Sequence, residues 1–149
     1  LFIPLHMGVD EIMSPQTYAE FYWRGLKKLM MAGIENGLTP YVFCEGNYTS
    51  RLEQLCDVPK GKVIYMFEKV DMKKAKETVG QVACICGNVP TSTLMYSTKE
   101  QVENETKKLL DICAPGGGFI MDASIVIDKC NKENLHAMFD TALKYGSYR

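Results

Sequence analysis

The chain has 149 residues, of which 46% are hydrophobic and 23% are charged, the composition of an ordinary globular protein. Seventeen basic residues against eighteen acidic ones give a net charge of -1, and no basic run is interleaved with aromatic residues, which argues against nucleic-acid binding. The apolar stretches are strand-sized, far short of the ~20 residues that cross a bilayer, so we expect no membrane association.

The amino end begins at Leu1, inside an apolar segment, with neither an initiator methionine nor the features of a signal peptide. We therefore expect this chain to be cut from a longer polypeptide. Six cysteines stand mostly in apolar runs, where a thiol packs as a small hydrophobe, and a chain of this size needs no disulfides. Free thiols and a cytoplasmic location are predicted.

Apolar runs of strand length alternate with helical patterns along the chain. Ile3-Pro4-Leu5 resembles the end of a strand, and four further strands are predicted at residues 40–44, 62–67, 82–86 and 118–121. Helices are predicted to begin after the capping residues Ser14, Asp71, Thr98 and Asn131.

This alternation predicts an α/β protein with a parallel sheet, because strands that are apolar throughout suit a sheet covered on both faces. Two architectures fit the pattern: an open, doubly wound flavodoxin-like sheet, or half of a (β/α)8 TIM barrel with about four βα units. A whole barrel needs ~250 residues, about twice what four units supply.

In both architectures ligands bind at the carboxyl ends of the strands. Polar residues stand at or just after the end of each apolar run, and we expect them to meet at one rim. These candidate site residues are His6, Glu45, Tyr48, Arg51, Glu68, Asn88 and Asp122.

Three other features have structural interpretations. Asp71 is predicted to cap a helix, and His136 to lie on a helix surface. Cys84 and Cys86 point the same way on a strand, which suits packing better than zinc, since structural zinc sites usually use a C-x2-C loop. Gly116-Gly117-Gly118 precedes a strand and is predicted to be a turn, not a phosphate-binding loop.

Six segments, in the same order, give the chain a resemblance to a known family. They are Ile12-Met13-Ser14-Pro15, Phe43-Cys44-Glu45-Gly46-Asn47, Gly87-Asn88-Val89-Pro90, Ser97-Thr98-Lys99-Glu100-Gln101-Val102, Gly116-Gly117-Gly118-Phe119-Ile120 and Lys132-Glu133-Asn134-Leu135. Together they resemble the carboxyl-terminal half of the uroporphyrinogen decarboxylase superfamily, which also includes cobamide-dependent methyltransferases.

The resemblance implies a (β/α)8 barrel, of which residues 1–149 form the second half as one domain, with the first half absent. Half a barrel has two open sheet edges, so we also expect self-association or pairing with the missing half. Zinc-dependent methyltransferases of the family carry His-x-Cys and a later Cys, where this chain has Phe43, Glu45 and Ile125. The decarboxylases carry a histidine in a turn where this chain has Ala123-Ser124-Ile125.

Three functional hypotheses follow. The first is methyl transfer between a small methylated substrate and a corrinoid protein, with Glu45, Glu68 and His6 catalytic and able to hold zinc, and with Asn88, Tyr48, Arg51 and Asp122 binding substrate. The second is decarboxylation of a tetrapyrrole in porphyrin biosynthesis, which needs a positively charged cleft. The third is an inactive, self-associating half-barrel.

Overall fold

The structure, a computed structural model, describes residues 1–147. Its one sheet has five parallel strands in the order β1-β2-β3-β4-β5. The strands are β1 (Phe2–Leu5), β2 (Tyr41–Asn47), β3 (Ile64–Lys69), β4 (Cys84–Cys86) and β5 (Phe119–Ile120).

Each strand pairs with the next one along the chain, without a reversal of direction across the sheet. A doubly wound sheet reverses its strand order at a switch point, so this order rules out the flavodoxin-like alternative. Consecutive parallel pairing is the arrangement of a segment of a (β/α)8 barrel. The sheet has one strand more than the four predicted as complete units, because Ile3-Pro4-Leu5 lies in β1.

The connections between the strands, and the segment after β5, contain helices. They comprise α1 (Pro15–Thr17), the π-helical η1 (Tyr18–Trp23), α2 (Arg24–Glu35), the 3-10 turn η2 (Thr49–Arg51), α3 (Leu52–Leu55), α4 (Met72–Glu77), the 3-10 turn η3 (Val79–Gln81), α5 (Thr91–Tyr96), α6 (Lys99–Cys113) and α7 (Lys132–Tyr145).

The predicted helix starts are confirmed. The side chains of Ser14, Asp71 and Asn131 each accept a hydrogen bond from a backbone N–H in the first turn, and Thr98 forms a capping box with Gln101. The glycines at 116–118 lie in the turn between α6 and β5, as predicted, all with positive φ. The short helices α3 and α5 were not predicted.

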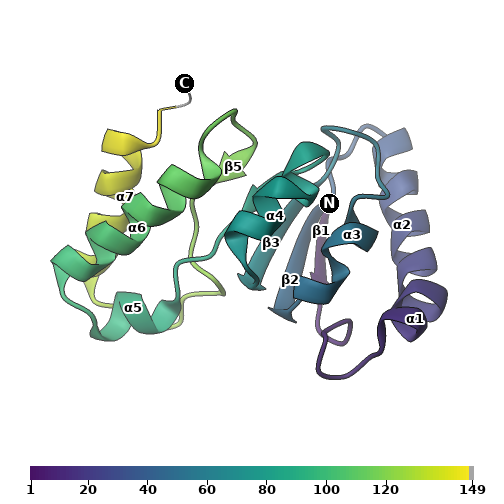
Figure 1. Cartoon of the computed structure of the whole chain (residues 1–149), viewed down its shortest axis with the longest axis horizontal. Coiled ribbons are helices and arrows are strands. Elements are labelled where there is room, and N and C mark those ends of the chain that lie inside the picture. Colours follow the sequence, from purple (N-terminus) through teal and green to yellow (C-terminus); the bar gives the residue numbers. More distant parts are fainter. Residues whose placement is uncertain (148–149) are drawn as a thin grey trace.

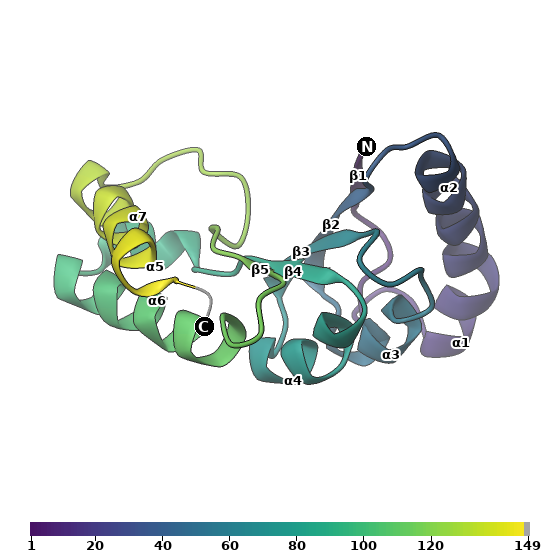
Figure 2. The same ribbon diagram turned by 90° about the horizontal axis from the view of Figure 1, so that it is seen from above.

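The two faces of the sheet carry separate apolar clusters, because successive side chains of a strand point to opposite faces. The larger cluster lies under the helices and includes Leu5, Cys44, Phe67 and Ile85. Figure 2 shows α2, α3 and α4 along this side of the sheet. The opposite face, here called the inner face, carries a smaller cluster built on Phe43, Met66 and Cys86, with Tyr41, Ile64 and Ile125 packed against it.

Helices α5, α6 and α7 form a lobe beside the sheet (Figure 1). The buried side-chain amide of Asn134 connects α7 to α5, because it donates to the carbonyl oxygens of Leu94 and Ser97 at 3.3 and 2.7 Å. Within residues 1–147, no helix combines the length and apolar character that crossing a bilayer requires.

Candidate active site at the carboxyl ends of the strands

His6 and Glu45 meet at the rim of the inner face. Residue 6 follows β1 directly and residue 45 lies near the end of β2, and the pairing of Leu5 with Cys44 brings the two next to each other. Nδ1 of His6 lies 2.5 Å from Oε2 of Glu45, with side chains that are 63% and 36% exposed. A carboxylate on Nδ1 fixes the orientation of the imidazole and directs Nε2 away from Glu45. The pair therefore leaves Nε2 of His6 on the far side of the ring from Glu45, where it can contact another group.

Glu68, near the end of β3, is held by the neighbouring strand. Its Oε2 accepts a hydrogen bond from the backbone N–H of Gly46 at 2.6 Å. Gly46 has a φ of +89°, and a Cβ there would lie 2.5 Å from Cγ1 of Val9. Only glycine fits this position without strain. Its backbone N–H binds Glu68 and its neighbour in sequence is Glu45, so the two carboxylates lie close to each other at the ends of adjacent strands.

Asp122 ends the row of acidic side chains beyond β5. Its Oδ1 accepts from the backbone N–H of Ala123 at 2.8 Å, and its Oδ2 lies 3.8 Å from Sγ of Cys86. Sγ of Cys86 also lies 3.4 Å from the hydroxyl of Tyr41, so a line of polar groups crosses the floor of the inner face. Burial raises the pKa of the Cys86 thiol to about 12, which keeps it protonated.

Asn88 lies at the edge of the rim. Its side-chain amide donates to the carbonyl oxygens of Glu68 and Val70, at 3.4 and 3.3 Å, and so joins the end of β3 to the loop after β4. The structure therefore places Asn88 beside the acidic row, with its NH2 group engaged by the backbone.

Tyr48 and Arg51, both predicted to orient the substrate, are buried below the loop that follows β1, with 0% and 1% of their surface exposed. The guanidinium of Arg51 donates to three carbonyl oxygens of that loop, and Tyr48 packs in the large cluster on the helix side of the sheet. In this position both side chains support the loop, and neither is exposed to contact a substrate. This corrects the expectation that they line the rim.

The predicted zinc ligands do not form a metal site. Among residues 1–147, no three side chains of His, Cys, Asp or Glu lie close enough to hold one ion together. Two positions that the resemblance aligns with zinc ligands, Phe43 and Ile125, belong to the apolar cluster of the inner face. Burial raises the pKa of both Cys84 and Cys86, which disfavours the thiolate that zinc binds. The donors that residues 1–147 supply therefore do not fit the zinc site that the resemblance implies.

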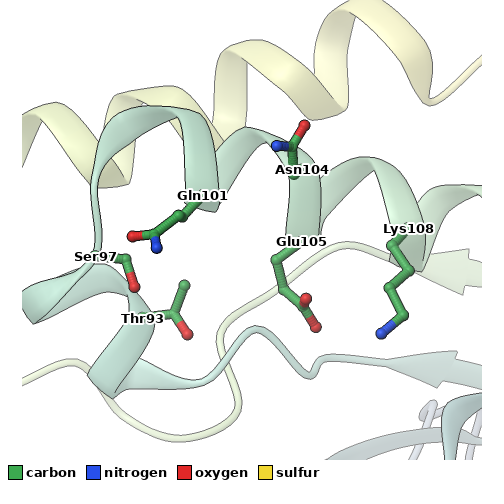
Figure 3. A pocket seen from close by; sticks show the side chains of 6 residues that line it. All are labelled: Thr93, Ser97, Gln101, Asn104, Glu105 and Lys108. Carbon is green, nitrogen blue, oxygen red and sulfur yellow. The ribbon is translucent and has the colours of Figure 1, made fainter.

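A groove lies outside the rim, between α5 and α6. This groove of about 370 Å³ is lined by Thr93, Ser97, Gln101, Asn104, Glu105 and Lys108. Figure 3 shows the side chains of Glu105 and Lys108 on one side of α6, with the amide of Asn104 pointing away from them. None of the candidate site residues lines this groove, but Glu105 and Lys108 also line a smaller neighbouring hollow with Asn88.

The fold and the rim together define a class: part of a (β/α)8-type barrel with titratable side chains at the carboxyl ends of its strands. The uroporphyrinogen decarboxylase (URO-D) family model matches residues 6–145, and the chain belongs to this family. A methyltransferase from Methanosarcina mazei has a similar structure, with a TM-score of 0.81 and 20% sequence identity over 98% of this chain and 42% of that chain. This chain thus spans less than half of that protein, and the likeness supports the partial-barrel fold. No curated protein matches the sequence.

Some residues around the site were not predicted. Tyr41 on β2 contacts Cys86 on β4 across the one intervening strand, β3, and its place on the inner face follows from alternation with Phe43. Asp10 and Ser50 bond to each other 40 positions apart in sequence, and no local pattern signals that pairing.

Proposed function

We propose that the complete enzyme transfers a methyl group between a small substrate and a corrinoid carried by a partner protein, which serves as the second substrate. The corrinoid supplies the cobalt that gives or accepts the methyl group. The observation that carries the proposal is the 2.5 Å contact between His6 and Glu45 at an exposed rim. The similarity to a methyltransferase fold supports the same class of reaction.

The pair supplies the proton transfer that methyl transfer to a thiol or amine requires. In the direction that methylates a thiol, the S–H bond breaks and Nε2 of His6 takes the proton while sulfur forms its bond to the methyl carbon. The electron pair of the broken cobalt–carbon bond stays with the corrinoid. In the reverse direction, the same nitrogen returns the proton to the leaving sulfur. Glu45 keeps the imidazole in the orientation that both directions need.

The other side chains of the rim have supporting roles in this proposal. Glu68 holds the Gly46 amide, and so fixes the end of β2 on which Glu45 lies. Asp122, half-buried at the end of β5, is proposed to bind a polar group of the small substrate. The proposal uses no zinc, because the donors among residues 1–147 form no zinc site.

Decarboxylation of a tetrapyrrole is less suited to this rim. A substrate with several carboxylates needs cationic side chains around it, and the described rim instead has Glu45, Glu68 and Asp122. Arg51, the arginine among the predicted substrate-binding residues, is buried, and its N–H groups donate to the loop after β1.

The test is a methyl-transfer assay on the complete enzyme with methylcobalamin and 2-mercaptoethanol as probes, followed by the visible absorption of the corrinoid. We expect thiol-dependent loss of methylcobalamin that His6→Gln and Glu45→Gln both abolish. Turnover of uroporphyrinogen without any methyl transfer would instead support the decarboxylase hypothesis and overturn the proposal.

A further inference from the structure

The loop between β1 and α1, residues 6–14, is held from below by one buried side chain. Nε of Arg51 donates to the carbonyl oxygen of Gly8 at 3.2 Å, and Nη2 donates to those of Val9 and Met13. The guanidinium lies 4.7 Å from the centre of the Tyr18 ring, and the residue is 1% exposed. A single planar fork thus binds three carbonyls of the loop, which the point charge of a lysine could not reproduce.

A second set of contacts ties the same loop to the segment after β2. The carboxylate of Asp10 accepts from the backbone N–H of Ser50 at 2.9 Å and from its hydroxyl at 2.8 Å. It also lies 3.4 Å from Nε of Arg51. The backbone N–H of Asp10 donates to the carbonyl oxygen of Asn47 at 2.9 Å. The loop and the end of β2 are therefore bound together at several points.

Close packing leaves this loop little freedom. A Cβ on Gly8 would lie 2.7 Å from the hydroxyl oxygen of Tyr48, and a Cβ on Gly46 would lie 2.5 Å from Cγ1 of Val9. Gly46 follows Glu45 directly, and His6 is the first residue of the loop. The contacts that fix Val9 over Gly46 consequently fix the two halves of the His6–Glu45 pair relative to each other.

We infer that Arg51 is a positioning residue, which holds the loop so that the His6 imidazole keeps Nδ1 on Glu45 and Nε2 toward the substrate. The kinetic part of this inference rests on the proposed function. The geometric part concerns only the orientation of His6 and can be measured without any substrate.

The experiment compares Arg51→Gln with Arg24→Gln, the same change at an exposed arginine on α2. Both are made in the complete enzyme, and folding is checked by circular dichroism. The imidazole nitrogens of His6 are followed by 15N NMR across a pH titration and assigned by their loss in His6→Gln. His136, exposed on α7, serves as the internal reference.

In the wild type and in Arg24→Gln we expect the neutral His6 ring to carry its proton on Nδ1. In Arg51→Gln we expect this preference to be lost, so that His6 has the tautomer mixture of His136. We further expect kcat to fall by about 10- to 100-fold with KM nearly unchanged, the scale of a small misplacement of a catalytic group. A purely structural role for Arg51 would lower the melting temperature and leave the His6 tautomer and kcat as they are.

A folded Arg51→Gln protein with wild-type His6 signals would overturn the inference. If that variant does not fold, the His6 signals are measured in Arg51→Lys and in Ser50→Ala instead. Unchanged His6 signals in both of these variants would also overturn the inference. A changed tautomer in Arg51→Gln, combined with full turnover in His6→Gln, would instead support the positioning role and refute the proposed function.

Discussion

Replacement of Glu45 by Gln separates the catalytic role of the His6–Glu45 pair from its contribution to stability. The substitution keeps the size of the side chain and removes the charge that orients the imidazole. The two side chains are 63% and 36% exposed, and pairs this open to solvent contribute about 0–1 kcal/mol to the free energy of unfolding. For a protein of this size, a loss of about 1 kcal/mol lowers the melting temperature by roughly 2–4 °C.

The expected effect on catalysis is much larger. In the proposed function Nε2 of His6 transfers the proton, and a side chain with that role contributes about 100- to 10,000-fold to the rate. Because Glu45 holds the imidazole in the orientation that this transfer needs, Glu45→Gln should lower the rate of methyl transfer by about 100-fold or more while the protein stays folded. Thermal unfolding and methylcobalamin turnover are measured on the same preparation. Glu35→Gln, at the exposed end of α2 and away from the rim, is the matched control. Unchanged turnover in Glu45→Gln would refute the role given to the pair.

Three further changes test the structure around the site. Gly46→Ala should lower the free energy of unfolding, measured with urea, by about 1–3 kcal/mol, because a φ of +89° and a Cβ at 2.5 Å from Val9 are both strained. Wild-type stability in this variant would contradict that account. Asp71→Ala should cost about 1 kcal/mol through the loss of the α4 cap and leave turnover unchanged, whereas a loss of turnover would place Asp71 in the site. Burial raises the pKa of Cys86 from 9.0 to about 12 and that of Cys113 to about 11, so the stability that these protonated thiols contribute is complete below pH 9 and is lost as the pH rises toward 12. The urea midpoint of unfolding should therefore decrease as the pH rises above 9, and it should decrease less steeply in Cys86→Ala. An equal decrease with pH in that variant would exclude Cys86 as a cause of the pH dependence.

The sequence predicts the elements of the fold well where the signal is local. The capping side chains of Ser14, Asp71, Thr98 and Asn131 act within one helical turn, so their residue types suffice to locate the helix starts. The order of the strands across the sheet is different, because pairing joins residues dozens of positions apart. Both a doubly wound sheet and half a barrel fit the alternation of strands and helices, and only the pairing of each strand with its successor decides between them.

The site residues show the same difference between local signals and contacts between distant parts of the chain. Glu45, Glu68 and Asp122 stand near the carboxyl ends of strands, and parallel pairing is enough to bring such residues to one rim. Tyr48 and Arg51 also follow a strand closely, and position alone gave them the same role. Their burial depends on the loop after β1, which lies about 40 residues away in sequence and covers them. A buried arginine that binds backbone carbonyls is not distinguishable from an exposed one by its neighbours in sequence.

The side chains of the inner face support a proposal in which proton transfer at the rim, and not a metal, activates the substrate. Phe43 and Ile125 are far apart in sequence, yet both lie in the apolar cluster with Met66 and Cys86. The resemblance aligns both positions with metal ligands, and in this chain neither side chain carries a donor atom. The side chains of Phe43 and Ile125 cannot hold a metal that would polarise a substrate, so the proposed function places activation at the rim above them. In the proposed function, His6 and Glu45 supply this activation by taking the proton of the substrate.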